Sequence, residues 1–334
     1  MYTEFYGLAK KPFNMTPDPA FLFLTAQHRE ALAGLTYAIL ERKGFLVLSG
    51  MAGLGKTTLL AWVLQKLPCE HVQSSVILNP LLTKEEFLEL AMLDFGLTDI
   101  PVSKAQRLWM LQKFLLRGRK EGKINVLIVD EAHKLSTELL EEIRLLGNLE
   151  YGDEKLIQIL LIGQSELDEV MNRPELWQLK QRVSVRLAIK PLSVDDVEKY
   201  IQHRWAIAGG KIPLPFTADA IANIRKFSKG IPRLINSLCD NALTSAFADE
   251  ARAVSAAHVE TAATDLQLIE KPPAVAVVPK PPSMPATAAN GTAFTVQPVT
   301  MKTMEPYMPL ARKRFVWHAM AVKFWRRNGK NPAQ

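Results

Sequence analysis

Short runs of mostly apolar residues alternate along the chain with longer segments in which apolar residues recur every three or four positions. The short runs cover residues 45–49, 75–79, 125–130, 156–162 and 183–189, and the last alternates more between apolar and polar positions. Helical periodicity marks residues 57–67, 84–93, 105–120 and 137–149. Uninterrupted apolar strands separated by helices are typical of a parallel sheet covered on both faces. The pattern therefore predicts a three-layer α/β domain over residues 1–191.

The strand pattern stops after Pro191, and amphipathic helical segments follow at residues 193–208, 217–227, 232–249 and 255–266. Ser193 and Thr217 are typical helix N-cap residues at the start of two of them. This predicts a C-terminal all-α lid domain over residues 192–267. Residues 268–310 are rich in Pro and Ala, which indicates a disordered linker, and residues 311–334 form a basic, aromatic tail.

The composition excludes several classes of protein. With 334 residues, of which 48% are hydrophobic, the chain can bury a substantial core and is not disordered throughout. Its two cysteines, Cys69 and Cys239, lie far apart, which excludes a disulfide framework and the usual zinc spacings and favours a reducing compartment. The sequence shows neither a signal peptide nor a run of about eighteen apolar residues. A cytoplasmic protein is expected.

The net charge of +7 is concentrated near the C-terminus. Residues 1–267 hold 31 basic and 32 acidic side chains, whereas residues 268–334 hold 10 and 2. The tail combines Lys and Arg with Trp and Phe over residues 312–327, a mixture that suits an anionic membrane surface. We expect peripheral contact with the inner membrane through this tail. A solvated tail that binds nothing, or one that binds nucleic acid, are the alternatives.

A glycine-rich loop lies directly after the first predicted strand and before a predicted helix. It matches the phosphate-binding P-loop pattern, in which glycines aim backbone N–H groups at phosphate oxygens beside a helix N-terminus. Lys56 is expected to reach the β and γ phosphates of ATP, and Thr57 to hold magnesium. The predicted nucleotide-binding residues are Gly50, Met51, Ala52, Gly53, Leu54, Gly55, Lys56, Thr57 and Thr58.

Two acidic residues and one amide follow neighbouring apolar strands. Asp130 is expected to hold magnesium, and Glu131 to orient and deprotonate the attacking water. His133 is interpreted as a structural or capping residue. Gln164, at the end of the 156–162 strand, is the candidate sensor of the γ phosphate or of the water, and an ordinary loop amide is the alternative interpretation.

Three arginines are candidates for stabilising charge on the transferred phosphoryl group. Arg182 would act in a neighbouring subunit as an arginine finger, which implies a homo-oligomer. Arg186 is the alternative, and a surface salt bridge would explain either residue. Arg233, in the element Gly230-Ile-Pro-Arg233 at a helix start, is expected to reach back over the nucleotide.

In their order along the chain, these motifs resemble those of the AAA+ ATPases, whose sheet runs 5-1-4-3-2 and is followed by a helical lid. Over residues 1–267 the chain is similar to the general secretion pathway protein A (ExeA-like) family. The motifs that carry this resemblance are Met1-Tyr-Thr-Glu-Phe-Tyr-Gly7-Leu, Pro12-Phe13, Pro17-Asp18-Pro19, His28-Arg-Glu-Ala-Leu32 and Ile231-Pro-Arg-Leu-Ile-Asn236-Ser-Leu-Cys-Asp240. The resemblance implies that residues 12–28 lie over the adenine, with a packing arm as the alternative.

The resemblance also implies a function. Members of the family are ATPases associated with the assembly of secretion, pilus or exopolysaccharide export machinery, and better-known members carry a membrane span and a periplasmic domain that this sequence lacks. We expect a cytoplasmic ATPase that supplies energy or a switch to such a membrane-associated complex. The alternative is a DNA-binding AAA+ ATPase of the transposition-helper or replication-initiator type. The near-neutral charge of residues 1–267 favours the first hypothesis.

Overall fold

The computed structural model describes residues 2–16, 18–67, 71–78 and 81–269. The predicted linker from residue 270 onwards and the basic tail of residues 311–334 lie outside the described residues. So does Cys69. Among the residues that the structure describes, no helix combines the length and the apolar character needed to cross a bilayer.

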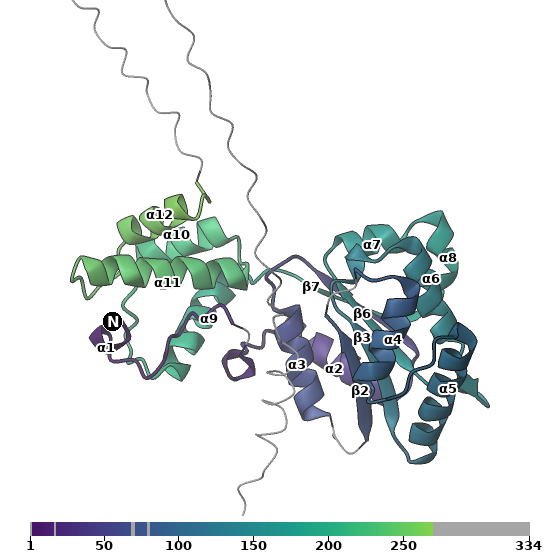
Figure 1. Cartoon of the computed structure of the whole chain (residues 1–334). Coiled ribbons are helices and arrows are strands. Elements are labelled where there is room, and N and C mark those ends of the chain that lie inside the picture. Colours follow the sequence, from purple (N-terminus) through teal and green to yellow (C-terminus); the bar gives the residue numbers. More distant parts are fainter. Residues whose placement is uncertain (1, 17, 68–70, 79–80, 270–334) are drawn as a thin grey trace, which may run out of the picture. The chain divides into compact units, whose positions relative to one another are not determined.

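A parallel five-stranded sheet in the order β2-β3-β6-β1-β7 forms the centre of the α/β region (Figure 1). Its strands are β1 (Phe45–Gly50), β2 (Val72–Ile77), β3 (Ile124–Val129), β6 (Gln158–Gly163) and β7 (Val183–Ile189). Counting only these strands gives the order 5-1-4-3-2, so the fold-class prediction is confirmed. A short antiparallel hairpin of β4 (Glu150–Tyr151) and β5 (Glu154–Lys155) interrupts the numbering.

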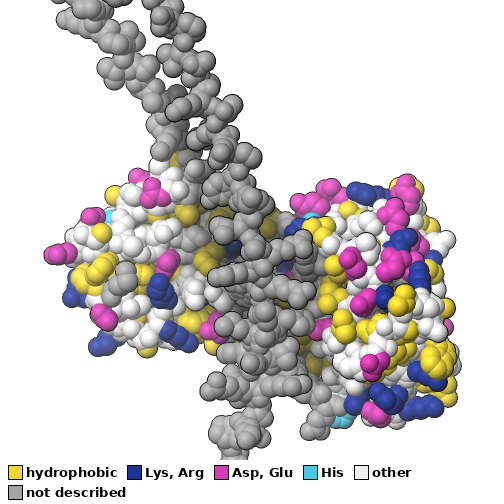
Figure 2. Space-filling view, in the orientation of Figure 1, with side chains coloured by type: hydrophobic (Ala, Val, Ile, Leu, Met, Phe, Trp, Pro, Cys, Tyr) yellow, Lys and Arg dark blue, Asp and Glu magenta, His cyan; other side chains and the backbone are white. Residues whose placement is uncertain are grey.

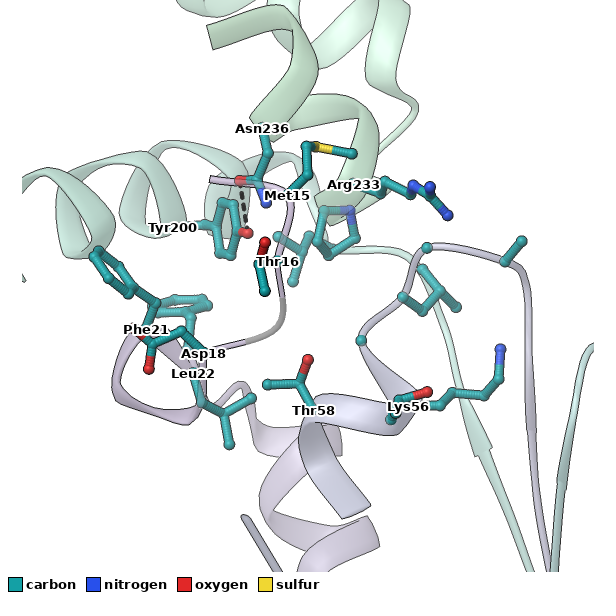
Figure 3. A pocket seen from close by; sticks show the side chains of 18 of the residues that line it. Met15, Thr16, Asp18, Phe21, Leu22, Lys56, Thr58, Tyr200, Arg233 and Asn236 are labelled. Atoms are coloured by element: carbon teal, nitrogen blue, oxygen red, sulfur yellow. Dashed lines mark hydrogen bonds between the residues drawn. The ribbon is translucent and has the colours of Figure 1, made fainter. Parts of the chain in front are cut away.

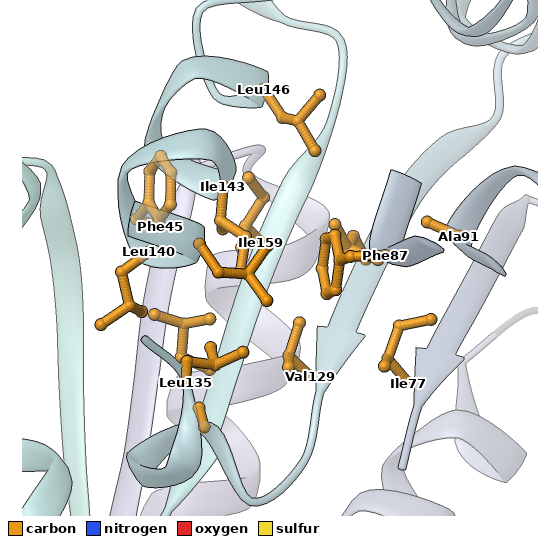
Figure 4. Close-up of a cluster of buried hydrophobic side chains, with 14 of the residues drawn as sticks. Phe45, Ile77, Phe87, Ala91, Val129, Leu135, Leu140, Ile143, Leu146 and Ile159 are labelled. Atoms are coloured by element: carbon orange, nitrogen blue, oxygen red, sulfur yellow. The ribbon is translucent and has the colours of Figure 1, made fainter. Parts of the chain in front are cut away.

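Helices cover both faces of this sheet because successive strand residues point to opposite sides. Leu46 and Leu48 of β1 pack with α2 (Ala26–Leu40) and α3 (Lys56–Lys66). Phe45 and Val47 pack into the other layer (Figure 4). That layer consists of α4 (Lys84–Asp94), α5 (Lys104–Lys120), α6 (Thr137–Leu146), α7 (Glu166–Met171) and α8 (Trp177–Lys180), with the 3-10 turns η2 (Ala132–Lys134) and η3 (Pro174–Leu176).

Two elements differ from the sequence expectations. Strand β2 begins at Val72, three residues before the predicted start, because its backbone pairs with β3 from Val72 opposite Ile124. Polar residues inside this strand had hidden its first half. Helix α2 was not predicted, although Thr25 caps it by accepting a hydrogen bond from the His28 N–H. The N-cap and the apolar spacing of Ala31, Leu32 and Leu35 were signals that could have revealed it.

The lid helices are α9 (Val194–Ile207), α10 (Ala218–Ser228), α11 (Pro232–Ala248) and α12 (Ala256–Asp265). Their shared core also holds Tyr2, Leu8, Phe13 and Phe21 from the N-terminal segment, which contains α1 (Tyr2–Phe5) and the 3-10 turn η1 (Pro19–Phe21). Residues 2–16 and 18–23, which we call the N-terminal arm, therefore pack with the lid helices. The arm reaches the sheet region through α2.

Acidic and basic side chains are interspersed on the visible face of the α/β region (Figure 2). This agrees with the nearly equal numbers of basic and acidic residues over 1–267. This face therefore lacks the single-sign field that would attract a polyanion.

Candidate nucleotide-binding site

The P-loop connects the end of β1 to the start of α3. Gly55 is the N-cap of α3 in the left-handed conformation, at φ 86°, so the helix begins at Lys56 with its free N–H groups facing the loop. A side chain at Gly50 would place its Cβ 2.6 Å from the carbonyl oxygen of Ile189 on the neighbouring strand β7. Glycine is therefore required at this position by close packing. The loop and helix start form an anion-binding geometry.

Lys56 lies at the mouth of this loop, with 7% of its surface exposed. Its Nζ donates to the carbonyl oxygens of Gly50, at 2.7 Å, and Met51, at 3.0 Å. Burial lowers the pKa of Lys56, while nearby carboxylates, including those of Asp130 and Glu131, oppose this shift. The ammonium group thus lies between the loop and the acidic strand end, and its contact with phosphates stays a prediction.

Thr57 and Asp130 come together across the sheet. The Thr57 hydroxyl donates to Oδ2 of Asp130 at 2.8 Å, and the other carboxylate oxygen accepts from the Glu131 N–H at 2.8 Å. Asp130 is buried at the end of β3, where its own N–H donates to the carbonyl oxygen of Ile77. A hydroxyl and a carboxylate side by side supply the hard oxygen ligands that Mg²⁺ prefers. The residues present fit this ion.

Glu131 occupies a left-handed backbone conformation at φ 54°, which is uncommon for a residue with a side chain. Its carboxylate pairs with Lys134 at 2.9 Å and lies 3.7 Å from Nε2 of His133. Burial alone would raise the pKa of Glu131. The contacts with Lys134, His133 and Gln164 outweigh that effect and hold the pKa below its ordinary value. The carboxylate is therefore ionised at neutral pH and able to accept a proton.

Gln164 follows β6 and lies beside the same carboxylate. Its side chain hydrogen-bonds to Glu131, and its backbone N–H donates to Nδ1 of His133 at 3.3 Å. His133 therefore connects the two strand ends. The structure brings the candidate sensor and the candidate base into direct contact, a pairing that sequence position alone did not indicate.

Arg182 and Arg186 lie away from the P-loop of their own chain. Arg182 precedes β7, whose first residue pairs with Phe45, so it lies at the end of the sheet opposite to Gly50. It donates to the carbonyl oxygen of Arg144, at 3.2 Å, and to the side chain of Asn148. Arg186 pairs with Asp168 at 3.2 Å. A finger role for either residue concerns a neighbouring subunit and stays a prediction.

Arg233 joins the lid to the P-loop. It lies in the first turn of α11, and its backbone N–H donates to the carbonyl oxygen of Gly53 at 3.2 Å. The packing is close, because a Cβ at Gly53 would lie 2.8 Å from the Cβ of Arg233 and 3.1 Å from Cγ2 of Ile231. The element Gly230–Arg233 therefore reaches the P-loop, whereas the expected contact of Arg233 with the nucleotide stays a prediction.

A cavity of about 480 Å³ unites these groups (Figure 3). Residues 52–58 of the P-loop and α3, with Glu131 and Gln164, line one part of it. The arm residues that line it are Asn14, Met15, Thr16, Asp18, Phe21, Leu22 and Phe23. The lid contributes Arg233 and also Tyr200, Arg204 and Asn236, which the sequence analysis missed. Tyr200 and Arg204 interrupt the apolar face of α9, and that interruption was the available signal.

His28, in the first turn of α2, contacts the P-loop. Its Nδ1 lies 2.7 Å from the Thr25 hydroxyl, and its ring also hydrogen-bonds to the backbone of Leu54. Burial lowers the pKa of His28 despite that backbone contact. The neutral imidazole therefore ties the start of α2 to the loop.

Comparison with known proteins agrees with this geometry. The family described as AAA domain matches residues 39–171, which contain the P-loop and the acidic strand end. The solved structures that match include Cdc6p from Pyrobaculum aerophilum, with a TM-score of 0.59 and 16% identity over 75% of this chain and 71% of that one. The ORC1 protein of Aeropyrum pernix, solved in complex with DNA, has a TM-score of 0.58 and 20% identity over 77% and 69%. The fold and the site together place the chain among the AAA+ nucleotide-binding proteins.

Two curated proteins refine this classification. General secretion pathway protein A of Aeromonas hydrophila is 42% identical over 252 residues, which are 74% of this chain and 45% of that protein. The predicted resemblance to the general secretion pathway protein A family is therefore confirmed over the part of that protein that the chain covers. The ATP-dependent target DNA activator B of Escherichia phage Mu is 30% identical over 209 residues, 58% of this chain and 59% of that protein. The chain thus spans about half the length of these relatives.

Proposed function

We propose that this protein binds Mg-ATP and hydrolyses the bond to its γ phosphate. The proposal rests above all on one observation: Lys56, the Thr57–Asp130 pair and the ionised Glu131 converge where the P-loop cavity meets the end of β3. A phosphate loop alone would support binding. An ionised carboxylate beside it adds a group that can orient the attacking water and accept its proton.

Each residue has a distinct role in this mechanism. The N–H groups of residues 53–57 and the Lys56 ammonium hold the phosphates at the start of α3. Glu131 accepts a proton from the attacking water, while Gln164 and His133 keep its carboxylate in place. Thr57 and Asp130 would hold Mg²⁺, which when bound neutralises charge on the phosphate oxygens. Arg233 contacts the nucleotide from the lid side of the cavity.

Two substitutions test this assignment. Lys56→Ala should abolish ATP binding, measured with a fluorescent ATP analogue, whereas Lys66→Ala in the last turn of the same helix should leave it unchanged. Glu131→Gln should preserve binding and reduce phosphate release by roughly 10²–10⁴-fold, the range of general base catalysis. The exposed Glu175→Gln is its control. Equal phosphate release from Glu131→Gln and wild-type protein would leave nucleotide binding without hydrolysis as the function.

The cellular role that we propose is a cytoplasmic energy-supplying or switch component for secretion, pilus or exopolysaccharide export assembly. Support comes from the 42% identity with general secretion pathway protein A across both the α/β region and the lid. In this role the protein works as a homo-oligomer associated with a membrane complex. In the native host, expression of Glu131→Gln should block export dominantly, because an inactive subunit enters the same assembly. Unchanged export would contradict this role.

A second candidate function is ATP-dependent DNA binding, which the identity with the phage Mu target DNA activator favours. A cluster of basic residues on α5 and just after it consists of Lys113, Arg117, Arg119, Lys120 and Lys123. Arg119 pairs with Glu154 and Lys123 with Glu121, so three of the five have no ion pair within the described part of the chain. Lys113, Arg117 and Lys120 form an exposed stripe on α5.

A salt titration separates the two functions. If the protein binds duplex DNA through this stripe, its affinity should fall steeply as salt rises, with a slope of about −0.9 per neutralised phosphate. Replacing Lys113 and Lys120 with Gln should then reduce the slope by about two. Full-length protein that binds DNA no better than serum albumin at low salt would leave export assembly as the function.

A further inference from the structure

A buried arginine lies at the part of the cavity far from the P-loop. Arg204 on α9 is 7% exposed and has no ion pair among the described residues. Its Nε donates to the carbonyl oxygen of Pro12 at 2.6 Å, and its Nη2 to that of Asn14 at 3.4 Å. Its guanidinium also lies 4.7 Å from the ring centre of Phe21. Arg204 therefore fastens the N-terminal arm to the lid beside the cavity.

The same guanidinium begins a chain of hydrogen bonds. Nη1 of Arg204 donates to the hydroxyl oxygen of Tyr200 at 3.1 Å, and the Tyr200 hydroxyl donates to Oδ1 of Asn236 at 2.9 Å (Figure 3). Arginine can only donate, and a tyrosine hydroxyl carries one hydrogen. The Tyr200 hydroxyl thus accepts from Arg204 and donates to Asn236.

This direction fixes the orientation of the Asn236 amide. Its oxygen is occupied by Tyr200, so the NH₂ group is the part of the amide left for a ligand. Asn236 lines the cavity and is 7% exposed. In Figure 3 its amide nitrogen lies above Thr16. The lid therefore presents a positioned hydrogen-bond donor to the cavity.

The position of this donor indicates which part of a nucleotide it meets. The phosphates occupy the N-terminus of α3, beside Lys56, in the function proposed above. The remainder of the cavity is bounded by the arm residues Thr16 and Leu22 and by Tyr200, a combination of apolar and polar groups that suits a purine. Adenine and guanine differ at N1 of the ring, which is an acceptor in adenine and an N–H donor in guanine.

We propose that Asn236 is a specificity-determining residue whose NH₂ group donates to N1 of adenine, and that Arg204 and Tyr200 are positioning residues that hold it in this orientation. This inference rests on the proposed ATP binding. Guanine would place its own N1–H against the Asn236 NH₂ group, leaving two buried donors opposed. Such a mismatch is how a polar site rejects a close analogue.

The test compares nucleotide affinities of wild-type protein, Asn236→Asp and Asn241→Asp, measured by competition with a fluorescent ATP analogue. Asn241 is exposed on the same helix and is a matched control for the added charge. Wild-type protein should bind ATP at least about tenfold more tightly than GTP. Asn236→Asp should lose about tenfold in ATP affinity and gain relative affinity for GTP, because a carboxylate accepts from the guanine N1–H. Asn241→Asp should behave as wild type.

Two further measurements separate positioning from a general structural effect. Tyr200→Phe keeps the ring but removes the hydroxyl, so the Asn236 amide is free to rotate. The preference for ATP over GTP should then shrink, while the melting temperature of the protein stays near that of Asn241→Asp. 7-Deaza-ATP, which lacks N7 and keeps N1, should bind like ATP. Unchanged ATP and GTP affinities in Asn236→Asp, or a loss of affinity for 7-deaza-ATP, would overturn the assignment. Wild-type protein that binds no nucleotide would instead overturn the proposed function.

Discussion

The close contact between Gly53 and the start of α11 leads to a quantitative prediction for the free energy of unfolding. Gly53 and Gly55 both have left-handed backbone conformations, at φ 81° and 86°. A Cβ at Gly53 would meet the Cβ of Arg233 at 2.8 Å, whereas a Cβ at Gly55 would meet no atom within 4 Å. Substitution by Ala therefore introduces the same kind of backbone strain at both positions. Crowding against the lid is added only at Gly53.

The magnitudes follow from these two effects. Left-handed strain should cost each variant about 1–2 kcal/mol in the free energy of unfolding. Gly53→Ala should cost about 1–3 kcal/mol more, the range for inserting a methyl group into a packed contact. Urea unfolding of nucleotide-free protein measures both, and the midpoints are comparable if the slope with urea is unchanged. Removing the opposing Cβ in the double variant Gly53→Ala/Arg233→Gly should recover about 1 kcal/mol or more as coupling energy.

The result that would refute this reasoning is equal destabilisation by Gly53→Ala and Gly55→Ala, within about 0.5 kcal/mol. It would mean that the start of α11 does not contact the P-loop in solution. The function of Arg233 at the nucleotide would then need a lid movement. A difference of the predicted size, with coupling to Arg233, would support direct transmission from the nucleotide loop to the lid.

Two further predictions concern pH and subunit contacts. Because burial holds the pKa of His28 below its ordinary value of 6.5, the unfolded chain binds more protons, so stability should fall as pH drops below about 6.5. In His28→Asn the free energy of unfolding should change less between pH 7 and pH 5 than in the wild-type protein, whereas His71→Asn, at an exposed position, should keep the wild-type dependence on pH. An unchanged dependence on pH in His28→Asn would contradict this role of His28. If Arg182 acts in a neighbouring subunit, Arg182→Ala should lose ATP hydrolysis alone and regain part of it when mixed with Lys56→Ala, which supplies an intact finger. If Arg186→Ala instead loses hydrolysis and regains it when mixed with Lys56→Ala, Arg186 is the finger. If neither mixture regains hydrolysis, neither arginine acts in a neighbouring subunit.

The strands of the sheet could be predicted from the sequence because each strand is marked by its own neighbouring residues. Continuous apolar runs predict strands buried on both faces, and the strand order followed from the resemblance to AAA+ proteins and is confirmed by the pairing of β1 with β6 and β7. The spacing of the P-loop glycines specifies its own backbone conformation, as Gly55 at the start of α3 shows. Asp130 and Glu131 were identifiable because parallel strands end at the same edge of a sheet.

The contacts within the site depended on tertiary structure. Nothing near Arg204 in the sequence indicates that it holds the carbonyl oxygen of Pro12, 192 residues away. The bond from Tyr200 to Asn236 and the contact of Gln164 with Glu131 likewise join separate elements.

The sequence by itself determined a P-loop α/β domain and the helical region after it, and it indicated candidate phosphate-binding residues, because periodicity and motif spacing report the conformation of neighbouring residues. Only the tertiary structure decided that the N-terminal arm belongs to the lid core and that Asn236 presents its amide to the cavity. Packing of Phe13 and Phe21 against α9 and its neighbours depends on burying apolar surface between distant segments. A hydrogen-bond direction depends on which donor and acceptor the fold brings together, and no local pattern carries that information.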